Sequence, residues 1–159
     1  MIRILPCLAA LALLAGALPA GAETARVISG EHADFTRLVI ELPAETDWTL
    51  GRTAMGYGFA TTTAAQPGYD LTSVWQRIQR NRLQALRVDP DAGTLLLTLG
   101  CACHAFAFDY QPGTVVLDIR DGTAPAGSAF QGAFSTAASP APRGTPPLAA
   151  TSVAYAWLD

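Results

Sequence analysis

The residues with the most reactive chemistry in this chain lie in one short cluster, Cys101-Ala102-Cys103-His104. Because Cys7 belongs to an N-terminal segment that we expect to be removed, Cys101 and Cys103 are the only thiols expected in the mature protein. In a regular strand their α-carbons would be about 6.6 Å apart, whereas a disulfide prefers about 5.5–6 Å. A bond between them therefore requires a bend, which Gly100 allows.

Three kinds of chemistry fit this cluster. In an oxidising compartment the two cysteines form a local structural disulfide or pack together unbonded. Alternatively, their thiolates select copper or zinc, and His104 or His32 completes the ligand set. The single residue between the cysteines is shorter than the gap in ordinary zinc knuckles, which weighs against zinc. A redox-active pair is the third alternative, although the usual redox motif has two intervening residues.

A second candidate site combines positive charge with an aromatic ring. Four arginines fall in one stretch that follows Trp75, namely Arg77, Arg80, Arg82 and Arg87. Guanidinium groups bind carboxylates through paired hydrogen bonds, and an indole ring offers a flat surface on which a sugar can stack. We therefore select Trp75, Arg77, Arg80 and Arg82 as candidate ligand-binding residues. A solvated face without a ligand is the alternative.

The composition excludes several classes of protein. All ten basic residues are arginines, so chemistry that needs a lysine, such as a Schiff base or a phosphate-binding loop, is excluded. The net charge of −3 argues against nucleic acid as a partner. The sequence also lacks the nucleophile elbow of hydrolases and the dinucleotide fingerprint. We expect no enzymatic activity and no cofactor apart from the copper or zinc alternative.

The first 22 residues have the features of a secretory signal peptide. Arg3 provides a positive charge, residues 5–18 are almost wholly apolar, and Ala20-Gly21-Ala22 offers small residues for cleavage. The apolar run is too short to span a membrane comfortably, and Pro19 interrupts it. The sequence predicts an exported protein, periplasmic or secreted, whose mature chain begins at Glu23 and has no membrane span.

Composition divides the mature chain into three parts. Residues 23–122 have regular apolar patterning and are expected to form one domain. Residues 123–150 are dominated by Pro, Ala, Gly, Ser and Thr and are predicted to be a linker. Residues 151–159 are predicted to be a docking tail or the start of a further segment, because they contain Val153, Tyr155, Trp157 and Leu158. We expect on these grounds that the chain is the front part of a longer protein.

The domain is predicted to be all-β, a small antiparallel sandwich. Short runs of alternating apolar residues are separated by turn signals such as Gln66-Pro67-Gly68 and Gln111-Pro112-Gly113. The predicted strands are 35–42, 48–52, 56–61, 83–88, 94–99, 105–109 and 114–120. Residues 70–78 could form one short helix, because Leu71, Val74, Trp75 and Ile78 have helical spacing. Trp48 and Phe59 are expected in the core.

Two of the predicted strands share a five-residue pattern. Leu38-Val39-Ile40-Glu41-Leu42 and Val115-Val116-Leu117-Asp118-Ile119 both follow the order apolar, Val, apolar, acid, apolar. Alternation predicts that Arg37, Glu41 and Asp118 lie on solvent-facing sides. Either these are unrelated half-exposed strands, or they are equivalent strands of a sandwich with internal two-fold pseudo-symmetry.

Two segments carry a resemblance to a known family: residues 37–42, in which an outward arginine precedes an apolar run, and residues 115–122. Together they resemble an AMIN-type domain, an exported β-sandwich module. The resemblance covers residues 26–122 and implies a non-catalytic targeting role. Domains of this family precede N-acetylmuramoyl-L-alanine amidases and pilus secretins and are thought to attach their partners to peptidoglycan or the division site. The cluster at residues 101–104 is not a general feature of that family, and the 159 residues contain no amidase or secretin domain.

These observations predict a non-catalytic periplasmic binding or targeting module for peptidoglycan or an envelope protein complex. The alternative is a small exported metal-binding or thiol-redox protein that uses Cys101, Cys103 and His104.

Overall fold

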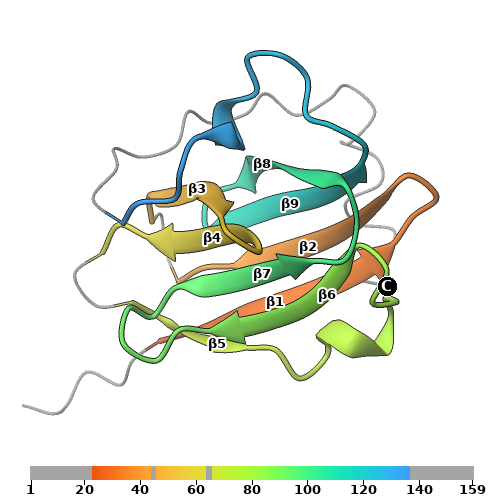
Figure 1. The fold of residues 1–159 in the computed structure, drawn as a ribbon. Coiled ribbons are helices and arrows are strands. Elements are labelled where there is room, and N and C mark those ends of the chain that lie inside the picture. The colour runs from red at the N-terminus through yellow and green to blue at the C-terminus, as the bar shows by residue number, and fades with distance from the viewer. Residues whose placement is uncertain (1–22, 44–45, 64–65, 137–159) are drawn as a thin grey trace, which may run out of the picture.

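The chain folds into two β-sheets packed face to face (Figure 1). The computed structural model describes residues 23–43, 46–63 and 66–136. Apolar side chains at alternate positions of the strands face inward between the sheets, which favours two layers over a single sheet. The strands in this part of the chain are β1 (Thr24–Glu31), β2 (Phe35–Glu41), β3 (Trp48–Thr53), β4 (Gly56–Thr61), β5 (Gly68–Asp70), β6 (Leu83–Val88), β7 (Leu95–Leu99), β8 (Cys103–Gln111) and β9 (Thr114–Asp121).

Sheet A has five strands in the order β5-β1-β2-β9-β8, and sheet B has four in the order β3-β4-β7-β6. Every pair of neighbours is antiparallel except β1 and β5, which are parallel. The predicted all-β antiparallel sandwich is therefore confirmed. Two strands, β1 and the three-residue β5, lie outside the strands that the sequence predicts.

The strand order contains an internal two-fold pattern. Strands that are five places apart in the sequence occupy equivalent positions: β1 corresponds to β6, β2 to β7, β3 to β8 and β4 to β9. With this correspondence, the order β1-β2-β9-β8 of sheet A becomes β6-β7-β4-β3, which is the order of sheet B. The five-residue pattern shared by residues 38–42 and 115–119 does not correspond to this symmetry. Its two strands, β2 and β9, are direct neighbours in sheet A, with Leu38 opposite Leu117, whereas the pattern relates β2 to β7.

Inward side chains of both sheets form one apolar core. Trp48 and Phe59 lie in it as predicted, with their ring centroids 5.7 Å apart. The indole N–H of Trp48 donates to Asp109 Oδ1 at 2.7 Å, so the large ring is buried without losing its hydrogen bond. Other large core side chains that are fully buried are Tyr57, Phe130, Leu38, Ile40, Leu83, Leu95, Leu97, Leu117 and Ile119.

The segment between β5 and β6 contains a single helical turn instead of the predicted short helix. This turn is the 3-10 helix η1 (Val74–Gln76). Asp70, the first residue of the predicted helix, accepts hydrogen bonds from the backbone N–H and the hydroxyl of Thr72 and so forms a local turn. Ser29 Oγ donates to the carbonyl of Val74 and holds the turn against β1.

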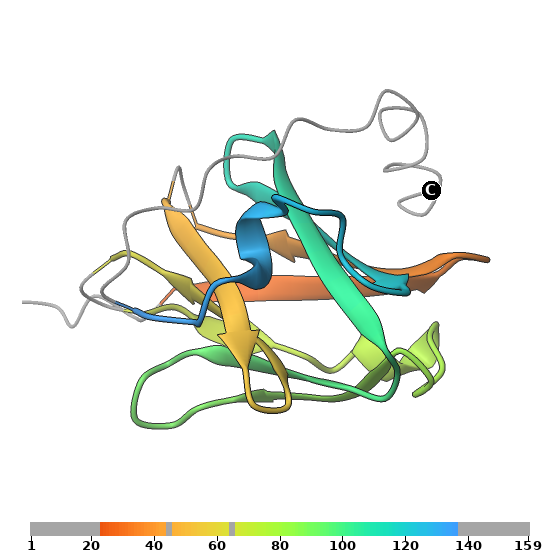
Figure 2. The ribbon, with the colours of Figure 1, turned by 45° about the horizontal axis from the view of Figure 1, so that its top comes forward.

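The first part of the predicted linker packs on the sandwich, so the boundary expected at residue 122 is too early. Residues 123–136 run from the end of β9 back to β3 through η2 (Ala129–Gln131) (Figure 2). Phe130 is buried, with its ring centroid 6.0 Å from that of Trp48 on β3 and 6.2 Å from that of Phe106 on β8. This one ring joins the two sheets, which a count of Pro, Ala and Gly does not reveal.

Three predicted segments lie outside the described residues: the signal peptide 1–22, the remainder of the linker 137–150 and the tail 151–159. The described residues contain no helix that could span a membrane.

Candidate functional site

The Cys101–Cys103 pair lies at the corner where the chain leaves sheet B and enters sheet A. Residues 100–102 connect β7 directly to β8. The two cysteines are joined by a disulfide, with their α-carbons 5.3 Å apart, which corresponds to the first of the three alternatives. A Cβ on Gly100 would lie 2.6 Å from the carbonyl oxygen of Asn81, so the close approach of two backbones at this corner requires glycine.

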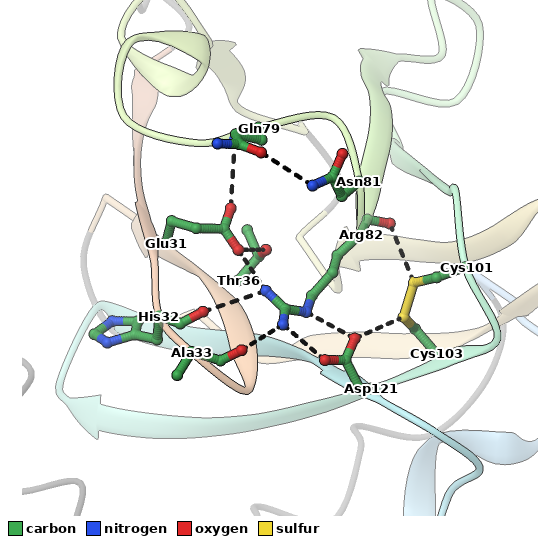
Figure 3. Close-up of polar contacts among 10 residues, drawn as sticks. All are labelled: Glu31, His32, Ala33, Thr36, Gln79, Asn81, Arg82, Cys101, Cys103 and Asp121. Carbon is green, nitrogen blue, oxygen red and sulfur yellow. Dashed lines mark hydrogen bonds and ion pairs between the residues drawn. A yellow bond between two sulfur atoms is a disulfide. The ribbon is translucent and has the colours of Figure 1, made fainter.

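Arg82 lies at the same corner and is the centre of a polar network (Figure 3). Its Nε and Nη2 donate to the two oxygens of Asp121 at 2.8 and 2.7 Å. Its Nη1 donates to Glu31 Oε1 at 2.5 Å and to the carbonyl of His32 at 3.2 Å, and Nη2 also donates to the carbonyl of Ala33 at 2.6 Å. All five N–H donors of the guanidinium are therefore used within the protein.

This network gives Arg82 a structural role, which separates it from the other predicted binding residues. Its side chain is 13% exposed and connects the start of β6 in sheet B to the β1–β2 turn and the end of β9 in sheet A. The hydrogen bonds from Arg82 lower the pKa of Asp121 below its usual range, and those to Asp121 and Glu31 raise the pKa of Arg82. Because no donor is left, Arg82 is not available to a ligand.

The structure does not bring His104 together with the two cysteines. Residues 103 and 104 are consecutive in β8, so their side chains point to opposite faces of sheet A. His104 Nδ1 is 3.0 Å from the carbonyl oxygen of Gly122. The third group beside the sulfur atoms is Asp121, which with Cys101 and Cys103 forms a cluster whose possible ligand atoms lie within 4.8 Å of one another. As a disulfide, the two sulfurs offer this cluster no thiolate.

Trp75 and Arg80, by contrast, lie together at the surface. The guanidinium carbon of Arg80 is 3.7 Å from the centroid of the Trp75 ring, a cation–π contact. Arg80 Nη1 donates to the carbonyl of Gln84 at 2.8 Å, which fixes the plane of the guanidinium. Arg77 and Arg80 are exposed, and Trp75 is half-buried against the core. We call Trp75, Arg77 and Arg80 the Trp75 surface.

The loop that carries the Trp75 surface is attached to β1 at several points. Besides the bond from Ser29 to Val74, Ser73 Oγ donates to the carbonyl of Val27 at 3.3 Å. The backbone N–H of Gln79 donates to Glu31 Oε2 at 3.4 Å. The loop is therefore positioned by the same carboxylate that binds Arg82, and the two candidate sites share one supporting residue.

Sequence reasoning placed Arg37 and Asp118 on solvent-facing sides, and the structure corrects this. Both point away from the core as the alternation predicts, yet both are almost completely buried. They lie opposite each other on β2 and β9 and form an ion pair, while the ring of Phe35 lies 4.9 Å from the Arg37 guanidinium carbon. Glu41, on the same face of β2, lies opposite Thr114.

No protein-family model, curated protein or solved structure matches this chain. The AMIN-type resemblance therefore stays a prediction from the residues that suggested it.

Proposed function

We propose that this chain is a non-catalytic binding module of the periplasm that attaches to peptidoglycan through the Trp75 surface. An envelope protein complex is the alternative partner for the same surface. The proposal rests on one observation, the stacking of the Arg80 guanidinium on the Trp75 ring in a loop that is fixed to β1.

The chemistry of this surface suits an anionic ligand that carries carboxylates. A stacked guanidinium loses less conformational freedom on binding than a free one and presents a planar fork that matches a carboxylate. Exposed Arg77 adds a second positive charge on the same loop. The peptide stems of peptidoglycan carry carboxylates, which the outer edge of the Arg80 guanidinium can bind while its face rests on the Trp75 ring.

The AMIN-type resemblance supports the same role, because it implies an exported β-sandwich that localises a partner without catalysis. The predicted signal peptide at residues 1–22 would deliver the module to the periplasm. All N–H donors of Arg82 are used within the protein, so Arg82 is not expected to contact the ligand. Arg77 and Arg80, which follow Trp75 on the loop, are exposed and are the arginines expected to bind.

The test is cosedimentation of the mature chain, residues 23–159, with isolated sacculi. We expect the wild-type chain to pellet with the sacculi and the double variant Arg77→Ala/Arg80→Ala to bind about tenfold or more weakly, because charge-assisted hydrogen bonds contribute about 1.5–3 kcal/mol each. Arg87→Ala is the matched control, since Arg87 is an exposed arginine on β6, away from Trp75 in the sequence.

Two results would contradict the proposal. If the wild-type chain stays in the supernatant, peptidoglycan is not the ligand. If the double variant pellets as well as Arg87→Ala, the Trp75 surface is not the contact. Substitution of Arg82 is unsuitable for this assay, because it would remove the network at the corner between the sheets.

A further inference from the structure

The two cysteines of the Cys101–Cys103 disulfide differ in their access to solvent. Cys103 is the first residue of β8 and is 4% exposed. Cys101 precedes the strand and reaches solvent, and its neighbours Gly100 and Ala102 are exposed. The rate of thiol–disulfide exchange depends on which sulfur a thiolate can attack. At this corner a thiolate from solution has access to the sulfur of Cys101 and little access to that of Cys103.

An oxygen atom lies beside each of the two sulfurs (Figure 3). Cys101 Sγ is 3.9 Å from the carbonyl oxygen of Arg82, and Cys103 Sγ is 3.7 Å from Asp121 Oδ1. A disulfide sulfur carries no proton, so neither contact is a hydrogen bond in the oxidised protein. In the reduced protein each S–H group would donate to its neighbouring oxygen. The corner therefore already contains an acceptor for each thiol, including the buried one.

The carboxylate of Asp121 favours one protonation state of Cys103 after reduction. Hydrogen bonds from Arg82 lower the pKa of Asp121, so this carboxyl group is ionised near neutral pH. A thiolate beside a carboxylate is unfavourable because both groups are negatively charged, and burial disfavours the thiolate further. We therefore expect Cys103 to be released as a neutral thiol that donates to Asp121.

The backbone of the corner is held in place without the disulfide. The N–H of Gly100 donates to the carbonyl of Arg82 at 3.0 Å, and the N–H of Gly122 donates to the carbonyl of Ala102 at 2.9 Å. The disulfide joins residues only two positions apart, so it restricts the unfolded chain little. Opening the bond should therefore leave the sandwich folded and the two thiols side by side.

We propose that Cys101–Cys103 is a thiol–disulfide exchange site. A protein of the same compartment that carries a dithiol reduces the bond through Cys101, and Asp121 accepts the hydrogen bond of the released Cys103 thiol. The disulfide is then the oxidised form of the redox-active pair that the sequence allows. The site is separate from the Trp75 surface and goes beyond the proposed binding function, because it adds a covalent reaction with a second kind of partner.

The exchange balances in electrons and protons. A thiolate of the dithiol attacks Cys101 Sγ, the Cys101–Cys103 bond breaks, and its electron pair stays on Cys103 Sγ, which takes a proton from water. The second thiolate of the dithiol then attacks the partner sulfur of the mixed disulfide and releases Cys101, which is protonated in turn. The dithiol loses two electrons and two protons and becomes a disulfide, while Cys101 and Cys103 gain two electrons and two protons.

Reduction of the folded protein by dithiothreitol, a small dithiol, tests the site. The oxidised mature chain, residues 23–159, is treated with dithiothreitol, and free thiols are alkylated at successive times and counted by mass spectrometry. We expect both cysteines to become alkylated at a rate that low concentrations of urea do not change, while circular dichroism remains that of the folded protein. A bond that opens only as fast as the protein unfolds would overturn the proposal.

Two single-cysteine variants test which sulfur is attacked. Cys103→Ala leaves the thiol of Cys101, Cys101→Ala leaves that of Cys103, and each variant is incubated with oxidised glutathione. We expect Cys103→Ala to form the mixed disulfide about tenfold or more faster than Cys101→Ala, because exchange requires access to the sulfur. Equal rates in the two folded variants, or faster reaction at Cys103, would overturn the assignment of Cys101.

Asp121→Asn tests the acceptor for the Cys103 thiol. A neutral amide oxygen accepts a weaker hydrogen bond than a carboxylate, so the equilibrium with dithiothreitol should shift several-fold towards the disulfide. Asp91→Asn is the matched control, because it removes an exposed carboxylate in the turn between β6 and β7 and should leave the equilibrium unchanged. Circular dichroism establishes that both variants are folded. Equal equilibrium constants for the two variants would overturn the role assigned to Asp121.

Discussion

Arg37 and Asp118 face each other across β2 and β9, and the guanidinium donates from Nε and Nη2 to the two carboxylate oxygens at 2.7 and 2.9 Å. Their side chains are 4% and 0% exposed. The cost of removing two charges from water offsets most of their attraction, so such a pair adds little net stability. Loss of one partner, however, leaves a buried charge without compensation.

Replacement of one member of this pair should therefore be far more harmful than replacement of both. We expect Asp118→Leu to lower the free energy of unfolding by about 3–5 kcal/mol and Arg37→Met/Asp118→Leu to cost much less. Urea denaturation measures both. Glu41→Gln is the control, because the Glu41–Arg26 ion pair at 3.8 Å is exposed and should contribute less than about 1 kcal/mol. A single variant as stable as the double variant would contradict this account.

The Cys101–Cys103 disulfide should contribute only modest stability. The loop that it closes is so short that the loss of chain entropy in the unfolded state amounts to about 2 kcal/mol or less. We expect Cys101→Ala/Cys103→Ala to fold, to unfold at a slightly lower temperature than the wild type, and to be insensitive to reductant. A wild-type midpoint that reductant does not change, together with two titratable thiols in oxidised material, would exclude the bond.

Acid should weaken the ion pair between Arg82 and Asp121 and so lower the stability of the protein. The hydrogen bonds from Arg82 hold the folded-state pKa of Asp121 below its ordinary value of about 3.9. This contribution to stability is complete above the unfolded-state pKa and is lost as the pH falls through the folded-state pKa. Arg82→Gln should reduce the loss between pH 5 and pH 2, measured by denaturation at each pH.

The Arg82→Gln variant should still lose some stability as the pH falls. Asp70 and Asp89 also have lowered pKa values, because each accepts hydrogen bonds from residues two or three positions on. An Arg82→Gln profile parallel to that of the wild type would show that the contact with Arg82 does not lower the pKa of Asp121.

Tyr69 should produce a loss of stability at alkaline pH. Burial raises its pKa to about 12, because the phenolate would be poorly solvated. Stability from this group is complete below the unfolded-state pKa of about 10 and is lost as the pH rises from 10 towards 12. Tyr69→Phe should flatten this part of the profile and cost little at pH 7, because the buried hydroxyl has no hydrogen-bond partner. Phenolate absorbance would follow the titration.

Gly51 should be a sensitive position for the packing of residues 132–136 on β3. A Cβ there would lie 2.7 Å from the α-carbon of Phe134 and 2.9 Å from its backbone nitrogen, so the segment would have to move. We expect Gly51→Ala to cost about 1–3 kcal/mol and to speed hydrogen exchange at the Arg52 amide. Gly132→Ala, where nothing lies within 4 Å of the new Cβ, should change stability by less than about 0.5 kcal/mol.

Local patterns predicted most of the sandwich because alternation and turn signals act over a few residues. β1 was missed since its inward positions include Ala25 and Ser29, which are too small or too polar to stand out. The same limit hid Phe130, a single large side chain in a stretch of small ones.

The remaining contacts of the site form between strands that are far apart in the sequence. Arg82 meets Glu31 and Asp121 at sequence separations of 51 and 39, and Arg37 meets Asp118 at 81. A single sequence shows which side of a strand a charge occupies, but not which strand lies beside it. The stretch from Arg77 to Arg82 was therefore read as one surface, although only part of it reaches solvent.

The short parallel contact between Arg52 and Ala133 has a consequence for the minimal folding unit. β3 is the last strand of sheet B, and its Arg52 backbone exchanges hydrogen bonds with Gly132 and Phe134 at 2.8 and 2.7 Å. Without these partners the backbone N–H and C=O of Arg52 would be unpaired at the edge of sheet B, where they could pair with another molecule. Residues 23–122 alone are therefore prone to self-association, and the independent unit extends to at least Phe134.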